Sequence, residues 1–156
     1  MIKYVKGDAT APIGKGIKLI VHVCNDIGAW GAGFVLALSK KWDGPETEYR
    51  RIPAAKRKLG YVQYIPVGDN TFVVNMIGQH NIKPNEFGVS PVRYGAIGVC
   101  LKKAAEFART LNNGKTPVSI HMPRIGCGLA GGSWTIMEQV IEEAVGDVPV
   151  VVYDFE

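Results

Sequence analysis

The sequence is poor in cysteine and lacks any long apolar run. Its three cysteines, Cys24, Cys100 and Cys127, are odd in number and far apart, so neither a disulfide framework nor a C-x-x-C metal site is expected. Its His, Asp and Glu residues also lack the spacing typical of metal ligands. No stretch approaches the roughly 18 consecutive apolar residues of a membrane span, and the first residues lack the apolar core of a signal peptide. We therefore expect a protein of the reducing cytoplasm that needs no metal and no cofactor and has no contact with a membrane.

The length and composition fit one ordinary globular unit. A chain of 156 residues has room for one sizeable core but would be cramped as two, so a single domain over residues 1–156 is predicted, and we expect a monomer. The net charge of +4 comes largely from the basic run Arg50–Lys58. Such a run either attracts nucleic acid or, more commonly, forms a solvated helix face. We do not expect nucleic acid to be the main partner.

Short apolar runs alternate with longer segments of helical periodicity. Lys18–Val23 is nearly continuous in apolar residues, which is typical of a strand buried on both faces of a sheet. Pro53 interrupts a helical segment at Glu46–Lys58, and Ser90 with Pro91 would cap and open a long helix. This alternation predicts an α/β protein with helices on both faces of a sheet. The predicted strands are Ile2–Val5, Lys18–Val23, Tyr61–Pro66, Thr71–Ile77, Val118–Met122 and Pro149–Tyr153, and the predicted helices are Phe34–Lys41, Glu46–Lys58, Ser90–Leu111 and Ser133–Val145.

Two glycine-rich loops follow two of the predicted strands. One spans Gly28–Gly33 after Lys18–Val23, and the other spans Gly126–Gly132 after Val118–Met122. In open α/β sheets ligands bind beyond the carboxyl ends of the strands, and glycine lets backbone N–H groups converge on a phosphate at a helix N-terminus. Each loop alone is also compatible with a tight turn that holds no ligand. The two together favour a diphosphate held from both sides.

The second loop also has the pattern of a nicotinamide dinucleotide site, because residues 126–131 satisfy G-x-G-x-x-G. That fingerprint, however, normally opens the domain and directly follows its strand. Here it lies in the last strand–helix–strand unit, and Pro123, Arg124 and Ile125 separate it from the strand. A nicotinamide dinucleotide is therefore the weaker interpretation of this loop.

Four segments resemble the macrodomain family. Lys6–Thr10, with the sequence KGDAT, looks like the opening loop of macrodomains, and His22–Gly33 is similar to their ribose and phosphate loop. Met122–Leu129, with the sequence MPRIGCGL, looks very like the second loop of the terminal ADP-ribose protein glycohydrolase branch, and Val152–Phe155 resembles its last strand. The resemblance runs in order through residues 1–156. It implies a three-layer α/β/α fold with a mixed, mostly parallel central sheet of about six strands.

The two tryptophans beside the loops carry a second resemblance. Trp30, within the first loop, and the Gly-x-x-Trp that ends at Trp134 are similar to the yeast ADP-ribose-1″-phosphate phosphatase. This branch, too, acts on a derivative of ADP-ribose. Both resemblances therefore imply that the ligand is ADP-ribose or a derivative of it.

The resemblance also implies roles for individual residues. Asp8 would accept a hydrogen bond from the adenine amine, and Phe155 would wall the adenine pocket. Asn25 would face the distal ribose, and His22 would take part in catalysis. From the residues alone, Asp8 as a turn cap, Asn25 as an Asx turn and His22 as a core residue stay open. The loop residues that would hold the distal ribose and the diphosphate are Gly31, Ala32, Gly33, Gly126, Cys127, Gly128 and Leu129.

The sequence departs from the family at two positions that matter for catalysis. The glycohydrolase branch uses a Lys near the end of the fourth strand and an Asp in the second loop. Here Gln79 and Ala130 stand at those positions. An amide cannot form a Schiff base, and a methyl group is neither an acid nor a base. The mechanism of that branch is therefore not expected in this chain.

Three functions remain open at this point. The first is an ADP-ribose-binding macrodomain that hydrolyses small derivatives, such as ADP-ribose-1″-phosphate or O-acetyl-ADP-ribose. The second is a reader of ADP-ribose without catalysis. The third is a nucleic-acid-interacting accessory protein that uses the basic face at residues 50–58.

Overall fold

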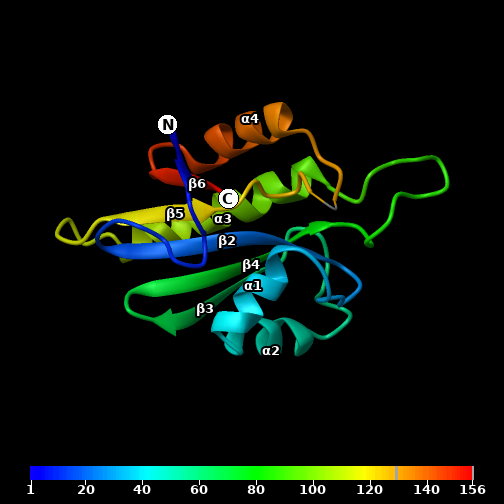
Figure 1. Ribbon diagram of the computed structural model, residues 1–156, viewed down its shortest axis with the longest axis horizontal. Helices are drawn as coiled ribbons and strands as arrows, with labels where there is room; N and C mark the ends of the chain where they lie inside the picture. The colour runs from blue at the N-terminus through cyan, green and yellow to red at the C-terminus, as the bar shows by residue number, and fades with distance from the viewer. Residues whose placement is uncertain (129, 156) are drawn as a thin grey trace.

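A six-stranded sheet forms the middle layer of the molecule (Figure 1). The computed structural model describes residues 1–128 and 130–155. The strands lie in the order β1-β6-β5-β2-β4-β3, and the neighbouring pairs are parallel except for β3 with β4. The sheet is thus mixed and mostly parallel, as predicted. Its strands are β1 (Ile2–Lys6), β2 (Ile17–Asn25), β3 (Val62–Gly68), β4 (Thr71–Gln79), β5 (Val118–Met122) and β6 (Val150–Asp154).

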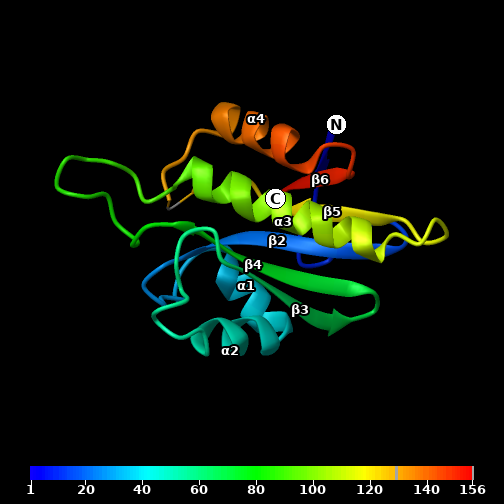
Figure 2. The ribbon, with the colours of Figure 1, turned by 180° about the vertical axis from the view of Figure 1, so that it is seen from behind.

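Two pairs of helices cover the two faces of the sheet (Figures 1 and 2). Side chains alternate between the faces along a strand. On β2, Leu19 and Val21 belong to the core under α3 and α4, whereas Ile20 packs with Leu38 and Tyr49 on the other side. Because β2 is buried on both faces, it must be apolar nearly throughout, and the predicted three-layer α/β/α fold is confirmed. The helices are α1 (Phe34–Lys41) and α2 (Gly44–Arg50) on one face, and α3 (Tyr94–Leu111) and α4 (Trp134–Val145) on the other.

The helix predicted at Glu46–Lys58 is wrong beyond Arg50, where α2 ends. Pro53 disfavours a helical conformation for the residue before it and has no N–H to donate, so the helix stops short of it. The basic run therefore does not form a helix face, and several of its cations are engaged locally. Arg50 pairs with Glu46 at 2.8 Å, and Arg57 Nε donates to the Asp26 carbonyl at 3.2 Å.

The helix predicted to open at Ser90 and Pro91 begins later, at Tyr94. The intervening residues continue the pairing of the sheet. His80 N–H donates to the Pro91 carbonyl at 2.8 Å, and Val92 forms an antiparallel bridge with Gln79. These backbone hydrogen bonds beyond the end of β4 compete successfully with the local capping signal of a Ser-Pro pair.

The sheet topology brings the two glycine-rich loops to one edge. β2 and β5 are parallel neighbours, so Gly28–Gly33 and Gly126–Gly132 both begin at the carboxyl ends of adjacent strands. Ligands of open α/β sheets bind at that edge. Within residues 1–128 and 130–155, no helix has the length and apolar character needed to cross a membrane.

Close packing between β4 and α3 makes a glycine necessary at position 78. A Cβ on Gly78 would overlap Ile97 Cγ1 and would lie 3.3 Å from Val23 Cγ1. We expect Gly78→Ala to lower the free energy of unfolding by about 1–3 kcal/mol, as overpacked core substitutions do. Urea unfolding would measure the change.

Gly98→Ala is the matched control for this experiment. Gly98 lies inside α3, where a Cβ would meet Val140 Cγ1 at an ordinary 3.5 Å. Because alanine favours a helix, this variant should gain about 0.5–1 kcal/mol. Equal stability of the two variants would contradict the tight contact described between β4 and α3.

Candidate ligand-binding site

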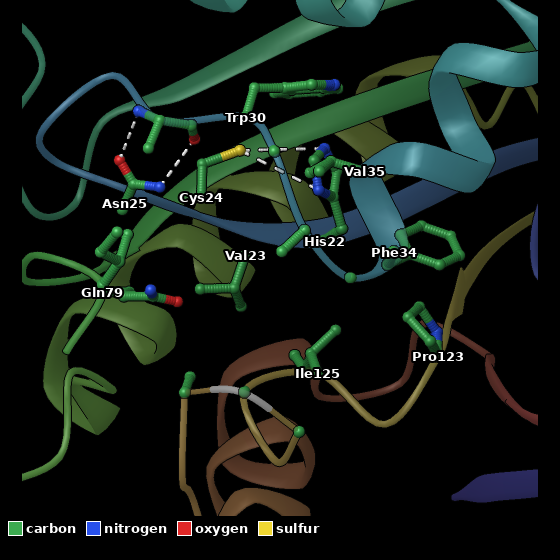
Figure 3. Close-up of a pocket in the computed structure, with 18 of the residues that line it drawn as sticks. His22, Val23, Cys24, Asn25, Trp30, Phe34, Val35, Gln79, Pro123 and Ile125 are labelled. Atoms are coloured by element: carbon green, nitrogen blue, oxygen red, sulfur yellow. Dashed lines mark hydrogen bonds between the residues drawn. The ribbon is translucent and has the colours of Figure 1, made fainter. Parts of the chain in front are cut away.

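A cavity of about 450 Å³ opens at the carboxyl ends of β2 and β4 (Figure 3). Its walls come from the end of β2 with the first glycine-rich loop, from the second glycine-rich loop, and from residues just beyond β4. Small-molecule sites usually measure about 300–1,000 Å³. The cavity brings together these predicted site residues: His22, Asn25, Gly31, Ala32, Gly33, Gly126 and Gly128.

Asn25 fastens the first loop to the end of β2. Its Oδ1 accepts hydrogen bonds from Ile27 N–H at 3.1 Å, from Ala29 N–H at 3.0 Å and from the Tyr49 hydroxyl at 2.8 Å. Its Nδ2 donates to the Ala29 carbonyl at 2.7 Å (Figure 3). The Asx turn that the sequence left open is therefore formed. Asn25 also lines the cavity, so one side chain both shapes the loop and borders the site.

The first loop leads into the N-terminus of α1, whose positive dipole end faces the cavity. Gly33 is the N-cap residue and has a φ of 82°, a left-handed conformation that favours glycine. Phe34 and Val35 also line the cavity. The first backbone N–H groups of a helix have no hydrogen-bond partner within the helix itself. The first turn has the sequence FVLA, which holds no carboxylate. An anion at this helix end would meet favourable charge and no acidic side chain of that turn.

The second loop is closed by its own backbone hydrogen bonds. Gly132 N–H donates to the Gly126 carbonyl at 2.7 Å, and Gly131 N–H donates to the Gly128 carbonyl at 3.1 Å. A Cβ on Gly132 would overlap the Gly126 carbonyl oxygen, so this closure requires glycine. By contrast, a Cβ on Gly128 would have no heavy atom within 4 Å. Gly128 thus presents bare backbone to open space in the cavity.

Two predicted members of the second loop are not placed in the cavity wall. Leu129 lies outside the described residues. Cys127 is half-buried and is not among the described residues that line the cavity. Burial raises the pKa of its thiol, and the nearby Arg124 opposes this only in part. The thiol therefore stays protonated at neutral pH, which makes it a poor nucleophile.

His22 lies at the base of the cavity and is only 2% exposed. Its Nε2 is 2.5 Å from Asn75 Oδ1, and the rings of Trp30 and Phe34 lie 5.5 and 5.9 Å from its own. Burial lowers the pKa of His22 to about 4, and the hydrogen bond with Asn75 only partly opposes this shift. The imidazole is therefore neutral at pH 7.

Asn75 determines which nitrogen of His22 carries the proton. Asn75 Nδ2 donates to the Pro45 carbonyl at 3.0 Å and to Gln63 Oε1 at 3.1 Å, so its Oδ1 faces His22 as an acceptor. The hydrogen of the neutral ring is consequently on Nε2, and Nδ1 keeps a lone pair. With a pKa near 4, this nitrogen is a weak base at neutral pH. The arrangement suits orientation of a polar group better than abstraction of a proton.

Gln79 and Ala130, which the sequence resemblance matches to the Lys and Asp of the glycohydrolase branch, both line the cavity. Gln79 Nε2 donates to the Asn81 carbonyl at 3.0 Å. Ala130 is 6% exposed and packs into the core beneath the second loop. Neither side chain has a group that could form a Schiff base or transfer a proton.

Asp8 and Phe155 lie beyond the carboxyl ends of β1 and β6 and are not in the cavity wall. Asp8 Oδ1 accepts hydrogen bonds from the N–H and the hydroxyl of Thr10, both at 2.8 Å. Asp8 therefore caps the turn that follows β1. Gly7 N–H donates to the Asp154 carbonyl at 3.0 Å, which places Asp8 next to the end of β6. Phe155 follows directly and is 80% exposed, so it is available as a surface for a flat ring.

Arg124 and Ile82 are among the cavity residues that were not predicted from the sequence. Arg124 reads as a spacer between the strand and the second loop, although a cation directly after a strand at the carboxyl edge is a usable signal. Ile82 belongs to the loop after β4, where the apolar residues follow no period, and it is 44% exposed. Nothing in the sequence marks it as part of a site.

Comparison with known proteins agrees with this fold. No protein-family profile matches the chain. A solved structure from Bacteroides thetaiotaomicron is 52% identical, with a TM-score of 0.92, over 99% of this chain and 98% of that one. The macrodomain protein from Streptomyces coelicolor is 46% identical, with a TM-score of 0.80, over 99% of both chains. The ADP-ribose 1″-phosphate phosphatase of Candida albicans is 26% identical over 92% of this chain and 93% of its own length.

The three-layer fold and a cavity between two glycine-rich loops define the class to which the chain belongs. Identity of 46% over nearly the full length of a macrodomain protein is more than a shared fold. The chain is a member of the macrodomain family.

The burial of His22 predicts a loss of stability in acid. Its pKa is near 4 in the folded state and about 6.5 in an unfolded chain, so the unfolded state binds the proton more readily. Stability should therefore fall by about 3 kcal/mol as the pH drops from 6.5 to 4. His22→Gln, which keeps an N–H donor for Asn75, should lose this part of the pH dependence. Urea unfolding at pH 7 and pH 4.5 would measure it.

His80→Gln is the control, because that imidazole is 57% exposed. It should follow the pH dependence of the unaltered protein, with at most a small change from the loss of its contact with Asp26. A His22→Gln protein with the same slope as the unaltered one would show that His22 is not held neutral by burial.

Proposed function

We propose that the cavity binds ADP-ribose or a derivative, with the diphosphate between the two glycine-rich loops. The observation that carries this proposal is that both loops and the N-terminus of α1 border one cavity. Convergent backbone N–H groups and a helix dipole are suited to an extended anion with little side-chain charge. The Candida albicans relative, which is named for a derivative of ADP-ribose, supports the same ligand.

The two ends of the ligand would occupy different parts of the edge. The adenine would lie at Asp8 and Phe155, with the Asp8 oxygen that is not used in the Thr10 turn as an acceptor for the exocyclic amine. The distal ribose would lie over Asn25 and Gly31–Gly33. This orientation places the diphosphate between the loops and the distal ribose near His22.

We further propose slow hydrolysis of small derivatives, namely ADP-ribose-1″-phosphate or O-acetyl-ADP-ribose. The name of the Candida albicans relative favours this activity. Water would attack the phosphorus of the 1″-phosphate or the acyl carbon of the acetyl ester, and the bond from that atom to the ribose oxygen would break. Inorganic phosphate or acetate would be released, and the proton lost by the water would pass through solvent to the ribose oxygen, which leaves as a hydroxyl group. Neutral His22 would orient the water through its Nδ1 lone pair. No step of this kind calls for a metal or a cofactor. A reader without catalysis is the alternative.

We propose that residues 1–156 act as one monomeric unit in a reducing compartment such as the cytoplasm. The three cysteines are free thiols, and β1 and β6, from the two ends of the chain, pair within one sheet. The local pairing of Arg50 and Arg51 with Glu46 and Glu48 supports a solvated role for the basic run over nucleic-acid binding.

ADP-ribose should bind more tightly than AMP or NAD in calorimetry, because only ADP-ribose combines the diphosphate with an unsubstituted distal ribose. Gly128→Val should weaken ADP-ribose binding by at least about tenfold, since the new side chain would occupy open space in the cavity. The fold should persist, because position 128 is open and its φ is not left-handed.

Gly95→Val is the matched control for the cavity. Gly95 lies on α3, also has no heavy atom within 4 Å of a built Cβ, and does not line the cavity. It should bind ADP-ribose normally. A preference for NAD, or normal affinity in Gly128→Val, would refute the diphosphate site between the loops.

Hydrolysis should be tested on two kinds of substrate. The unaltered protein should release phosphate from ADP-ribose-1″-phosphate, unaffected by EDTA, and His22→Gln should be slower with little change in binding. Removal of mono-ADP-ribose from a protein glutamate should be poor, because Gln79 and Ala130 replace the Lys and Asp pair. Tight binding without turnover of any substrate would leave the reader function, and efficient removal from glutamate would mean that another residue supplies the chemistry.

A further inference from the structure

The ion pair between Arg124 and Asp154 lies between the cavity and the edge that holds Asp8. Arg124 lines the cavity, and its Nε and Nη2 donate to the two Asp154 carboxylate oxygens at 2.6 and 3.0 Å. The backbone carbonyl of Asp154 accepts from Gly7 N–H at 3.0 Å, directly before Asp8. Phe155 follows Asp154 in the chain. The pair thus joins the two parts of the proposed ligand site.

Two aromatic rings hold the guanidinium of Arg124 in place. Its Cζ lies 5.2 Å from the ring centroid of Tyr4 and 5.1 Å from that of Trp134. Trp134 Nε1 donates to the Tyr4 hydroxyl at 3.0 Å, which fixes the two rings relative to each other. Bidentate pairing and ring contacts together define the plane of the guanidinium. Asp154 is therefore an oriented carboxylate.

Both partners remain accessible to a ligand. The side chains of Arg124 and Asp154 are 41% and 42% exposed. The hydrogen bonds from Arg124 hold the pKa of Asp154 below its usual range, so this carboxylate is ionised at neutral pH. An ionised carboxylate with exposed oxygens accepts hydrogen bonds from hydroxyl groups and repels phosphate.

We propose that the Arg124–Asp154 pair forms the subsite for the adenosine ribose, in which Asp154 accepts a hydrogen bond from the 2′-hydroxyl and rejects a 2′-phosphate. The proposal rests on the proposed function, because it takes the adenine to lie at Asp8 and the diphosphate between the loops. The ribose that joins the adenine to the diphosphate must lie in the space beside the Arg124–Asp154 pair. Carboxylates beyond a strand end recognise ribose hydroxyls in other nucleotide-binding sheets.

The pairing with Asp154 also explains why Arg124, a cation at the cavity, would not favour a ligand with an additional phosphate on the ribose. Arg124 alone would favour an additional phosphate on the ribose. Because both Asp154 oxygens are engaged by Arg124, the pair has no net charge, and a 2′-phosphate would lie against the carboxylate edge. The specificity is thus for the free hydroxyl.

Calorimetry with three probes tests the subsite: ADP-ribose, its adenosine 2′-phosphate and its 2′-deoxyadenosine form. In the unaltered protein, ADP-ribose should bind at least about tenfold more tightly than either analogue, as expected for a hydrogen bond to a charged group. Asp154→Asn should reduce the discrimination against the 2′-phosphate by about tenfold or more. Arg124→Gln should change the ratio in the opposite direction, because it leaves the carboxylate uncompensated.

Asp147→Asn is the matched control, because Asp147 pairs with Arg109 at 3.4 Å and does not line the cavity. It should leave all three affinities unchanged. If ADP-ribose itself does not bind to the unaltered protein, the proposed function fails. If it binds, but the 2′-phosphate binds equally well or the ratio is the same in Asp154→Asn and Arg124→Gln, then the ribose subsite alone is refuted. Opposite shifts in two variants exclude a general loss of folding as the cause.

Discussion

The whole site depends on the parallel pairing of β2 with β4 on one side and β5 on the other. Parallel neighbours leave the sheet at the same edge, so the loops that follow them converge whatever their sequences. Ile20 pairs with His121, and Asn25 pairs with Gln79 across a register shift at the end of β2. Asp26 N–H then donates to the Gln79 carbonyl at 3.1 Å and extends the pairing into the first loop. The cavity is the space that remains where these strands stop.

Burial explains both the stability of this edge and its limited chemistry. Burial among aromatic rings keeps His22 neutral, and the hydrogen bond with Asn75 Oδ1 fixes its proton on Nε2. Gln79 and Ala130 add only an amide and a methyl group to the cavity wall. Ligand affinity would come from backbone N–H groups, which titrate with neither acid nor base. In the proposed complex, such a site would bind phosphate and ribose over a wide pH range, but it has few groups that can transfer a proton.

The sequence predicted the order of the strands and helices because their signals are local and strong. Lys18–Val23 is continuous in apolar residues, and the glycine clusters stand directly after two strands. It failed where long-range backbone hydrogen bonds decide the conformation, as at Pro91 and Val92, which pair with the residues beyond β4 and not with a helix. Arg124 was missed for a similar reason, since its partners Tyr4, Trp134 and Asp154 come from three distant segments. Family resemblance pointed to loop glycines and to His22, most of which line the cavity in the structure, but it did not reveal that burial makes His22 a weak base.

The amide of Asn75 has a consequence for how this sequence can change over time. It joins His22 at the base of the cavity to the Pro45 carbonyl of α2 and to Gln63 of β3. Loss of the amide at position 75, or of the hydrogen-bonding side chain at position 22 or 63, would leave a polar atom without its partner, at a cost of about 1–3 kcal/mol. The side chains at positions 22, 63 and 75 therefore depend on one another, and through the Pro45 carbonyl the same amide also ties α2 to the base of the cavity.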